Sequence, residues 1–403
     1  FAVADPDLTK KITVRNLVCA CTGVPRRDLE LVFNAGQLTP EGVIASLKGF
    51  QFYTKFGEAF QYSNQMVATG GYAAAAAAGG RYGELGEAYA TQLRRRVLDP
   101  IGMDRTTLSF ADVEADGDYA TPHGLRLDNM YTRLSLATEA FIEPVAPAGA
   151  IWSSANEMAR YALTELGRGV APDGTRVVSA ANLEETWQPQ VAVDAETSYG
   201  LGWFIGEYKG LKLIDHGGNT FGFTSDLAFL PDQGIGIVVL ANAQGSTLFN
   251  EGVRSRLFEL LFDQPEEYDQ QIAFAEQQTA QSEAALAKQL ADRADREAAA
   301  PYVGRYQNQA LGEVTIAFAN GRLYIDAGEF RSELRPLKQP VSGQPAFLMF
   351  DPPLAGLAVD LRRDADGRPG VSIKAGPDEY DFAVIETGTP RASPVAVGSP
   401  EAT

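Results

Sequence analysis

Residues 264–300 divide this sequence into two parts that follow different patterns. The segment lacks glycine and is dense in Glu, Gln, Ala, Arg and Lys, a composition that favours a solvated helical linker. A coiled coil is the alternative, but the apolar positions are too few to sustain heptads. We therefore expect separate domains at residues 1–263 and 301–387.

Strand periodicity runs through residues 301–387. Large apolar residues alternate over 314–318, Asn320-Gly321 supplies a two-residue hairpin turn, and the alternation returns over 323–325. This pattern predicts a small all-β barrel or meander. Residues 388–403, with their Pro, Ser, Thr and Gly, are expected to form a disordered tail.

Helical signals dominate the beginning of the first part. Thr39-Pro40 predicts a helix start, because Thr caps a helix and Pro fits its first turn. Residues 62–78 form another helical stretch, whose Gly and Ala residues predict a buried helix with closely packed neighbours. A further helix is expected over residues 155–166.

Strand patterns follow towards the end of the first part. Residues 199–205 carry alternate glycines and predict one strand that neighbours approach closely. Residues 211–214 predict a strand that runs into His216, and residues 225–230 and 235–240 flank a hairpin turn. This order predicts an α+β fold, with an antiparallel sheet flanked by helices and a helical lobe.

The net charge of −18 argues against some classes of partner. No basic patch is present to release counterions from nucleic acid or to attract anionic lipid. The apolar stretch over residues 67–78 is too short to span a bilayer. We therefore expect neither a nucleic-acid partner nor stable membrane insertion, and composition leaves the oligomeric state open.

Only one residue separates the two cysteines, Cys19 and Cys21. This spacing disfavours a relaxed disulfide between them. A metal site is also disfavoured, since neither of the two histidines lies nearby in sequence. We expect both cysteines to be buried as small hydrophobic residues, and we expect no metal or cofactor site.

Tyr62 and Asn64 form a Tyr-x-Asn motif where the small-residue helix begins. Acyl transfer through a serine needs a group that removes the hydroxyl proton and returns it to the leaving group. Tyrosine is a poor base at its free pKa of about 10, but beside a Lys ammonium it can share a proton. Alone, such a tripeptide is common and usually has no catalytic role.

His216 precedes two glycines that allow a substrate or another backbone to approach closely. The imidazole could donate to a carboxylate or to the Tyr62 oxygen. Alone, this motif is more often a solvent-exposed turn. The second histidine, His123, lies in an irregular stretch over residues 110–141, a usual location for substrate-selecting elements, and is expected to be structural or exposed.

Together these motifs resemble the serine β-lactamase and penicillin-binding-protein family, in particular its class C-like β-lactamases, D-aminopeptidases and esterases. The resemblance covers residues 10–262, and the set is specific although each member is weak. The matching segments are Val14-Arg15-Asn16-Leu17-Val18 with Thr22-Gly23-Val24-Pro25, Phe60-Gln61-Tyr62-Ser63-Asn64, Pro147-Ala148-Gly149, Tyr199-Gly200-Leu201-Gly202-Trp203, and Asp215-His216-Gly217-Gly218 with Gly222-Phe223-Thr224-Ser225. The resemblance implies a β-lactamase-like fold, followed by a lipocalin-like domain at residues 301–387.

The resemblance also implies catalytic roles for three side chains. Tyr62 would be the general base and acid, and Asn64 would orient the substrate and a Lys. His216 would stand where other members have Lys, where it would bind a substrate carboxylate or steady Tyr62.

The substrate-binding residues implied by the resemblance are Gly217, Gly218 and Asn219. The backbone N–H of Asn219 would be one half of the oxyanion hole, a donor worth about 3–4 kcal/mol. The nucleophile of the family lies in Ser-x-x-Lys, and no serine of this sequence has Lys three residues on. Because the chain begins at Phe1, we expect an N-terminal truncation, a nucleophile upstream and no activity of this chain alone.

The implied function is that of a serine hydrolase acting through an acyl-enzyme on an ester or amide. The substrate would be a D-amino-acid peptide, a β-lactam or a small carboxylic ester. The alternative is a non-catalytic member that binds peptidoglycan or a peptide, but the retention of Tyr62, Asn64 and His216 favours the enzyme. Because the family generally works outside the cytoplasm, a periplasmic, cell-surface or secreted location is expected.

Overall fold

The structure, a computed structural model, describes residues 1–339 and 345–387, so the tail predicted over residues 388–403 lies outside it. These residues form two compact units. The first unit comprises residues 1–31, 35–122 and 135–272, and the second comprises residues 32–34, 123–134 and those from 273 onward. A search of the described residues finds no helix that is long and apolar enough to cross a membrane.

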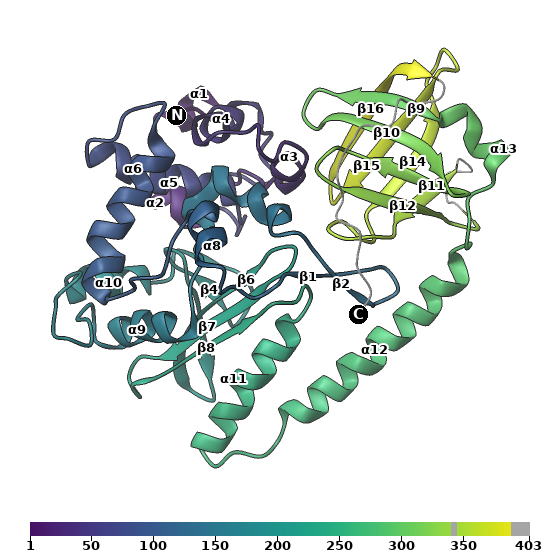
Figure 1. Ribbon diagram of the computed structural model, residues 1–403. Coiled ribbons are helices and arrows are strands. Elements are labelled where there is room, and N and C mark those ends of the chain that lie inside the picture. The colour runs from purple at the N-terminus through teal and green to yellow at the C-terminus, as the bar shows by residue number, and fades with distance from the viewer. Residues whose placement is uncertain (340–344, 388–403) are drawn as a thin grey trace. The chain divides into compact units, whose positions relative to one another are not determined.

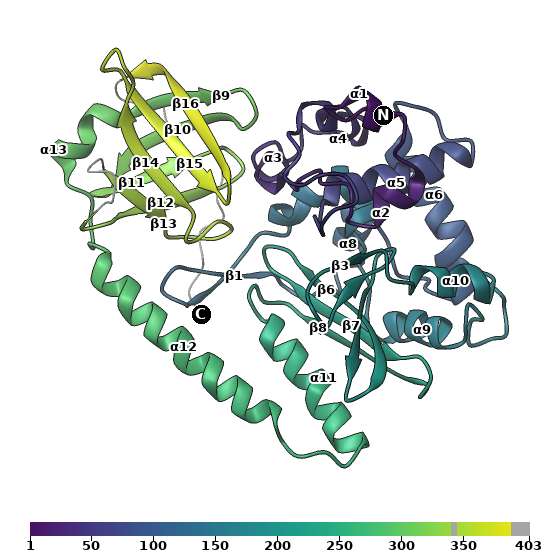
Figure 2. The same cartoon turned by 180° about the vertical axis from the view of Figure 1, so that it is seen from behind.

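A six-stranded antiparallel sheet lies within the first unit (Figure 1). Its order follows the sequence, with β3 (labelled in Figure 2) at one edge and β8 at the other. The strands are β3 (Val191–Ala192), β4 (Ser198–Tyr199), β5 (Phe204–Tyr208), β6 (Leu211–Asn219), β7 (Thr224–Leu230) and β8 (Ile235–Ala241). The predicted antiparallel sheet and the hairpin of β7 and β8 are thus confirmed.

Helices cover both faces of this sheet. Asp226 and Leu227 are neighbours on β7 and therefore point to opposite faces. Asp226 meets Arg254 of α11 (Thr247–Leu261), whereas Leu227 shares a core cluster with Ala162 of α9 (Ala155–Leu166). The helix predicted over residues 155–166 is confirmed, and the α+β fold is confirmed with it.

The prediction of one strand over residues 199–205 is wrong. The chain reverses between Tyr199 at the end of β4 and Phe204 at the start of β5, and the two residues pair directly. Gly200 N–H donates to the carbonyl of Trp203 at 2.8 Å, and Gly202 has a φ of +93° that only glycine adopts readily. The alternate glycines therefore serve a tight turn.

The helical lobe of the first unit is built around α5 (Asn64–Ala77), which confirms the buried helix predicted there. A Cβ at Gly70 would lie 2.8 Å from Val18, and one at Gly71 would lie 2.3 Å from Pro147, so neighbours approach α5 closely. The other short helices of this unit are α1 (Pro6–Thr9), α2 (Val14–Val18), α4 (Pro40–Ser46), η1 (Leu47–Gly49), α6 (Leu85–Leu93), η2 (Arg94–Leu98), α7 (Asp99–Ile101), α8 (Phe110–Asp116), η3 (Leu136–Ala148) and α10 (Ala180–Thr186), and α3 (Asp28–Phe33) extends from it into the second unit.

Cys19 and Cys21 form a disulfide, which corrects the expectation of two unbonded buried cysteines. The chain turns at Ala20, whose φ of +51° is left-handed, and this brings the two Cα atoms to 5.3 Å. That separation lies in the ordinary range for a disulfide. The sequence spacing alone does not reveal the turn, because Ala rarely adopts a positive φ.

The second unit contains a closed barrel of eight antiparallel strands, which confirms the predicted all-β barrel (Figure 1). Apolar side chains such as Ile316, Ile325 and Val359 are fully buried, as expected from the period-2 pattern. The strands are β9 (Gly304–Asn308), β10 (Gly312–Ala319), β11 (Arg322–Asp326), β12 (Arg331–Pro336), β13 (Ala346–Met349), β14 (Ala358–Arg363), β15 (Pro369–Ala375) and β16 (Asp378–Thr387). Before the barrel come α12 (Tyr268–Gln289), α13 (Arg296–Ala299) and η4 (Ala300–Tyr302).

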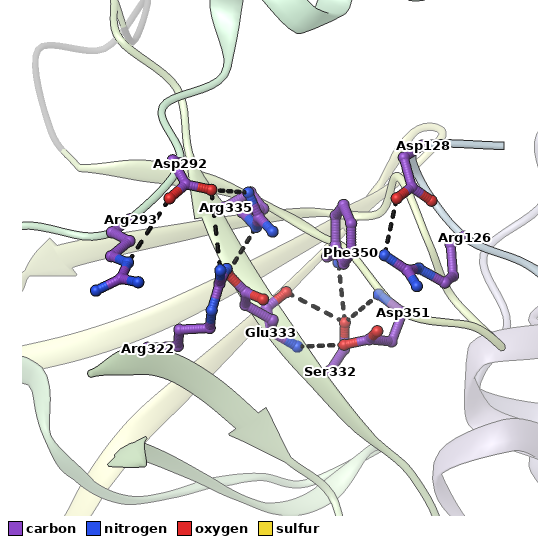
Figure 3. A network of polar contacts seen from close by, with 10 residues as sticks. All are labelled: Arg126, Asp128, Asp292, Arg293, Arg322, Ser332, Glu333, Arg335, Phe350 and Asp351. Atoms are coloured by element: carbon purple, nitrogen blue, oxygen red, sulfur yellow. Dashed lines mark hydrogen bonds and ion pairs between the residues drawn. The ribbon is translucent and has the colours of Figure 1, made fainter. Parts of the chain in front are cut away.

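A hairpin of β1 (His123–Leu125) and β2 (Tyr131–Arg133) also belongs to the second unit. In Figure 3, Phe350 lies between Arg126 of this hairpin and Arg335 of β12. The guanidinium carbons of Arg126 and Arg335 are 4.7 Å and 4.3 Å from the ring centroid, and Leu127 N–H donates to the Phe350 carbonyl at 2.9 Å. The hairpin is thus attached to the barrel by cation–π and backbone contacts.

Candidate functional site

A cavity of 1260 Å³ in the first unit brings the predicted site residues together. All of its lining residues belong to that unit, and many are apolar or aromatic, as in sites that bind small molecules. The predicted site residues that line it are Tyr62, Asn64, His216, Gly217, Gly218 and Asn219.

The segment before Tyr62 is held by the turn that contains the disulfide. Gln61 N–H donates to the carbonyl of Ala20 at 2.7 Å, and the Ser63 hydroxyl donates to the carbonyl of Pro25 at 3.0 Å. Ser63 keeps an extended backbone, and α5 begins at the next residue. Tyr62 therefore projects from a fixed extended segment immediately before a helix.

Aromatic side chains surround Tyr62. The ring centroids of Phe60 and Tyr199 lie 6.4 Å and 6.1 Å from that of Tyr62, and Phe204 packs 4.9 Å from Tyr199. Burial raises the pKa of Tyr62, although the positive charge of Arg26 opposes this. Tyr62 therefore remains a neutral phenol near pH 7 and needs a partner to act as a base.

His216 lies within β6, because that strand continues to Asn219 instead of ending before the histidine. The Tyr199 hydroxyl oxygen is 3.2 Å from Nε2 of His216, and Nδ1 is 2.6 Å from the carbonyl oxygen of Gly217. Burial lowers the pKa of His216, while the Gly217 carbonyl and Asp215 oppose this shift. The imidazole is therefore mainly neutral near pH 7.

Asn64 does not point freely into the cavity. Its side-chain amide donates to Oδ1 of Asp28 at 3.2 Å, and Arg26 Nε donates to Oδ2 of the same carboxylate at 2.7 Å. The guanidinium of Arg26 lies 5.5 Å from the ring centroid of Tyr62. The ion pair of Arg26 and Asp28 thus contacts both side chains of the Tyr-x-Asn motif.

The strand that carries Gly217 and Gly218 has one backbone edge without a partner strand among the described residues. β7 pairs with β6 as far as Asn219, whereas β5 pairs with it only as far as Asp215. A Cβ at Gly218 would lie 2.5 Å from Oγ of Ser225, so glycine permits the close approach of β7. An extended backbone could add to this edge by strand pairing.

Tyr199 was given no catalytic role by the sequence motifs, although it belongs to one of them. It contacts both predicted side chains, since its hydroxyl meets His216 and its ring packs edge-on at 6.1 Å from that of Tyr62. The signal that could have revealed it is the Tyr of the Tyr-Gly-Leu-Gly-Trp segment. Its register opposite Phe204 brings that hydroxyl to β6.

The charged side chains of the cavity suit a substrate bound by hydrogen bonds more than a bound metal ion. Three arginines but no lysine are found among its described lining residues. Glu139 also lines it, and burial raises the pKa of this carboxyl, although contacts with Thr220, Gly222 and Phe221 oppose the shift. Across residues 1–339 and 345–387, no group of three His, Cys, Asp or Glu side chains could hold a metal ion.

Comparison with protein families shows to which family this fold belongs. The model of the family described as "Beta-lactamase" matches residues 4–261, which is more than half of the chain. The chain belongs to the beta-lactamase family. The match spans the whole set of predicted site residues and ends before α12.

Two curated relatives show how this family member compares in length. The chain is 25% identical over 249 residues to "Unguisins hydrolase ungD'" of Aspergillus campestris. This alignment covers 59% of this chain and 44% of that protein. It is 26% identical over 274 residues to "Penicillin-binding protein 4" of Amycolatopsis lactamdurans. That alignment covers 62% of this chain and 64% of the other protein. The chain thus spans about half the length of the curated relatives it matches.

Among solved structures, the chain is similar to the octameric penicillin-binding protein homologue from Pyrococcus abyssi. The TM-score is 0.54 at 18% sequence identity, and the alignment covers 95% of this chain and 83% of the other. At this identity the likeness supports the beta-lactamase-family fold alone. The resemblance inferred from the motifs is therefore confirmed at the level of family and fold.

Proposed function

We propose that this chain carries the Tyr and His groups of a serine hydrolase that cleaves an ester or amide through an acyl-enzyme. The observation that carries the proposal is that Tyr62 and His216 line one cavity with their ring centroids 6.1 Å apart. Tyr62 comes from the extended segment before α5, and His216 comes from β6. A general base beside a substrate-binding edge is what acyl transfer requires.

In this proposal Tyr62 takes the proton of the nucleophile and later returns it to the leaving group. The free edge of β6 at Gly217 and Gly218 binds the extended part of the substrate. The backbone N–H of Asn219 donates to the developing oxyanion. Asn64 assists from the cavity wall, where Asp28 holds its amide.

The nucleophile is proposed to come from sequence outside these 403 residues, because no Ser-x-x-Lys occurs among them. Three serines line the cavity, and none has Lys three residues on: Ser153, Ser154 and Ser225. The first two have structural roles. Ser153 Oγ lies 2.7 Å from the Thr106 hydroxyl, and the Ser154 hydroxyl accepts from Glu157 N–H at the start of α9. Neither has a lysine nearby in sequence that could activate it.

The substrate is proposed to be a peptide with a D-residue, a β-lactam or a small carboxylic ester. A histidine at the position of the usual lysine favours a peptidase or esterase over a β-lactamase. The enzyme is further proposed to work outside the cytoplasm. The disulfide of Cys19 and Cys21 supports that location, since such bonds persist mainly in oxidising compartments.

The test begins with the gene sequence that precedes the codon for Phe1. If it encodes Ser-x-x-Lys, the extended protein is assayed on D-phenylalanine amide, its L enantiomer, a chromogenic β-lactam and a nitrophenyl ester. We expect hydrolysis of at least one, an acyl adduct by mass spectrometry, and a loss of at least 10²-fold in Tyr62→Phe, on the order of general-base catalysis. Tyr82→Phe, at an exposed position, is the matched control.

Two results would overturn parts of this proposal. Turnover by the 403-residue chain that Tyr62→Phe abolishes would contradict the external nucleophile. Absence of Ser-x-x-Lys from the whole gene would contradict the acyl-enzyme and would favour a non-catalytic protein that binds peptidoglycan or a peptide.

A further inference from the structure

A second pocket, of 470 Å³, lies in the first unit beside the large cavity. Gly217 and Asp226 line both spaces, so the two meet along the edge of β6 that β5 leaves unpaired. The volume lies within the range of about 300–1,000 Å³ that is typical of small-molecule sites. We call it the acidic pocket, because Asp215, Asp226 and Glu251 line it, and Arg254 is the one basic residue among its described lining residues.

Asp226 brings an unused hydrogen-bond acceptor to this pocket. The residue is only 4% exposed, and its Oδ1 accepts from the guanidinium of Arg254 at 2.9 Å. Its Oδ2 is buried and has no hydrogen-bond partner among the described residues. A buried carboxylate oxygen without a partner is unfavourable, because it has lost its contacts with water and gained none in return. The oxygen therefore needs a donor from outside the described part of the chain.

The charge of the pocket indicates what kind of donor fits. Arg254 is shared between two acids, since its guanidinium donates to Asp215 at 3.2 Å and to Asp226 at 2.9 Å. Glu251, three residues earlier on α11, adds a third carboxyl group to the lining. When ionised, three carboxyl groups and one guanidinium leave an excess of two negative charges, which favours a cation. Since no group of acids and histidines in residues 1–339 and 345–387 could hold a metal ion, an organic cation with N–H donors fits best.

The register of β6 on β7 places the acidic pocket within reach of a bound peptide. Gly217 pairs directly with Asp226, so both face the acidic pocket, whereas His216 pairs with Leu227 on the opposite face. Gly217 has no side chain that could cover Asp226. A peptide paired with the free edge of β6 would alternate its side chains between the same two faces. One side chain would thus lie towards His216, and the next would lie towards the acidic pocket.

We propose that the acidic pocket binds a substrate side chain that ends in an ammonium or guanidinium group. The cation donates a hydrogen bond to Oδ2 of Asp226, and the excess negative charge of the pocket balances its positive charge. Phe204 also lines the pocket and provides an apolar wall for the methylene chain of a Lys-like or Arg-like residue. This inference rests on the proposed function, and it selects, among the proposed substrates, a peptide with a basic residue next to the one that enters the large cavity.

Peptide binding to the intact chain tests the inference without turnover. The probes are N-acetyl-D-alanyl-lysine amide and its analogues with norleucine, Nε-acetyl-lysine or glutamate in place of lysine, so that the backbone stays the same. We expect the lysine probe to bind about 10-fold more tightly than the norleucine and Nε-acetyl-lysine probes, the gain from a charge-assisted hydrogen bond. The glutamate probe should bind most weakly, because its carboxylate meets the acids of the pocket.

The dissociation constants are measured by calorimetry at pH 8. Burial raises the pKa of Asp226 to about 6, and at pH 8 its carboxyl group is therefore ionised. The titratable and charged groups that face Asp226 are Asp215 on β6, Glu251 and Arg254 on α11, and Tyr268 at the start of α12. Of these, Arg254 favours the charged form of Asp226, and the two acids oppose it.

Two variants then locate the bound cation. Asp226→Asn keeps the shape of the side chain and removes its charge, so the preference for the lysine probe over norleucine should fall to about 1–2-fold. Glu251→Gln, at a less buried position, should reduce the preference less and tests the pocket even if Asp226→Asn does not fold. The matched controls are Asp232→Asn in the β7–β8 turn and Glu207→Gln on β5, both exposed. They change the net charge equally and should keep the full preference.

Equal binding of the lysine and norleucine probes would overturn the inference, and it is the result expected if a water molecule alone occupies Oδ2 of Asp226. A lysine preference that persists in both Asp226→Asn and Glu251→Gln would also overturn it, as would a lack of binding of all four probes at millimolar concentration. Hydrolysis by the extended protein tests the proposed function separately. A lysine preference without hydrolysis would contradict that function alone, and hydrolysis without the preference would contradict the acidic pocket alone.

Discussion

The side-chain amide of Asn64 donates a hydrogen bond of 3.2 Å to Asp28, an acid that also binds Arg26. Asn64→Asp would place two carboxyl groups at this distance and raise the pKa of one of them. The folded state would then bind more protons than the unfolded state. We expect the free energy of unfolding to decrease by about 1–3 kcal/mol between pH 4 and 7, relative to the wild type.

Urea denaturation at the two pH values measures this effect. The exchange variant Asp28→Asn with Asn64→Asp is the control, since it restores one amide and one carboxylate. The same pH dependence in Asn64→Asp and in the wild type would show that Asn64 and Asp28 are not in contact.

Asp226 on β7 is buried and pairs with Arg254 of α11 at 2.9 Å. Burial raises its pKa to about 6, although Arg254 opposes this. Since the unfolded value is about 3.9, the folded state binds more protons between these limits. The free energy of unfolding should therefore fall by about 2–3 kcal/mol as pH rises from 4 to 6.

Asp226→Asn should remove this part of the pH dependence. Glu165, whose pKa burial raises to about 7, contributes with the same sign in both proteins. The difference between wild type and variant across a pH series of urea denaturation therefore isolates Asp226. Parallel curves would contradict the raised pKa.

Gly71 of α5 faces Pro147 of η3 across a very short gap. An alanine Cβ would lie 2.3 Å from Cβ of Pro147, and the proline ring cannot move away by a rotamer change. We expect Gly71→Ala to lower the free energy of unfolding by about 1–3 kcal/mol. Gly49→Ala is the matched control, because nothing lies within 4 Å of its added Cβ, and should stay within about 0.5 kcal/mol.

Arg126 of the β1–β2 hairpin stacks on Phe350 in the second unit (Figure 3). Arg126→Ala removes this contact and should cost about 0.5–2 kcal/mol, with faster amide hydrogen exchange in β1 and β2. Arg133→Ala removes the same charge from an exposed position on β2 and is the control. Equal exchange rates in the two variants would show that the stacking does not hold the hairpin.

Much of the fold could be predicted from the sequence because its signals are local. Thr39 caps α4, with Pro40 at its first position, as its motif predicted. The Asn320-Gly321 turn joins β10 and β11, as the alternation around it predicted. The residues of the candidate site were also predicted as a set, and one cavity contains all of them.

The parts that could not be predicted depend on backbone turns and on contacts through space. A positive φ at Ala20 brings Cys19 and Cys21 together, and no sequence rule places alanine there. The partner of Asn64 is Asp28, which no motif connects with it. A strand over residues 199–205 was predicted from its glycines, but one of these makes a turn.

The sequence by itself determined the family and the folds of its two parts, because hydrophobic period, turn residues and motif order are properties of neighbouring positions. Only the tertiary structure decided that the Tyr199 hydroxyl meets Nε2 of His216. That contact needs the reversal between β4 and β5 and the register of β5 on β6, which bring side chains distant in sequence to hydrogen-bonding distance.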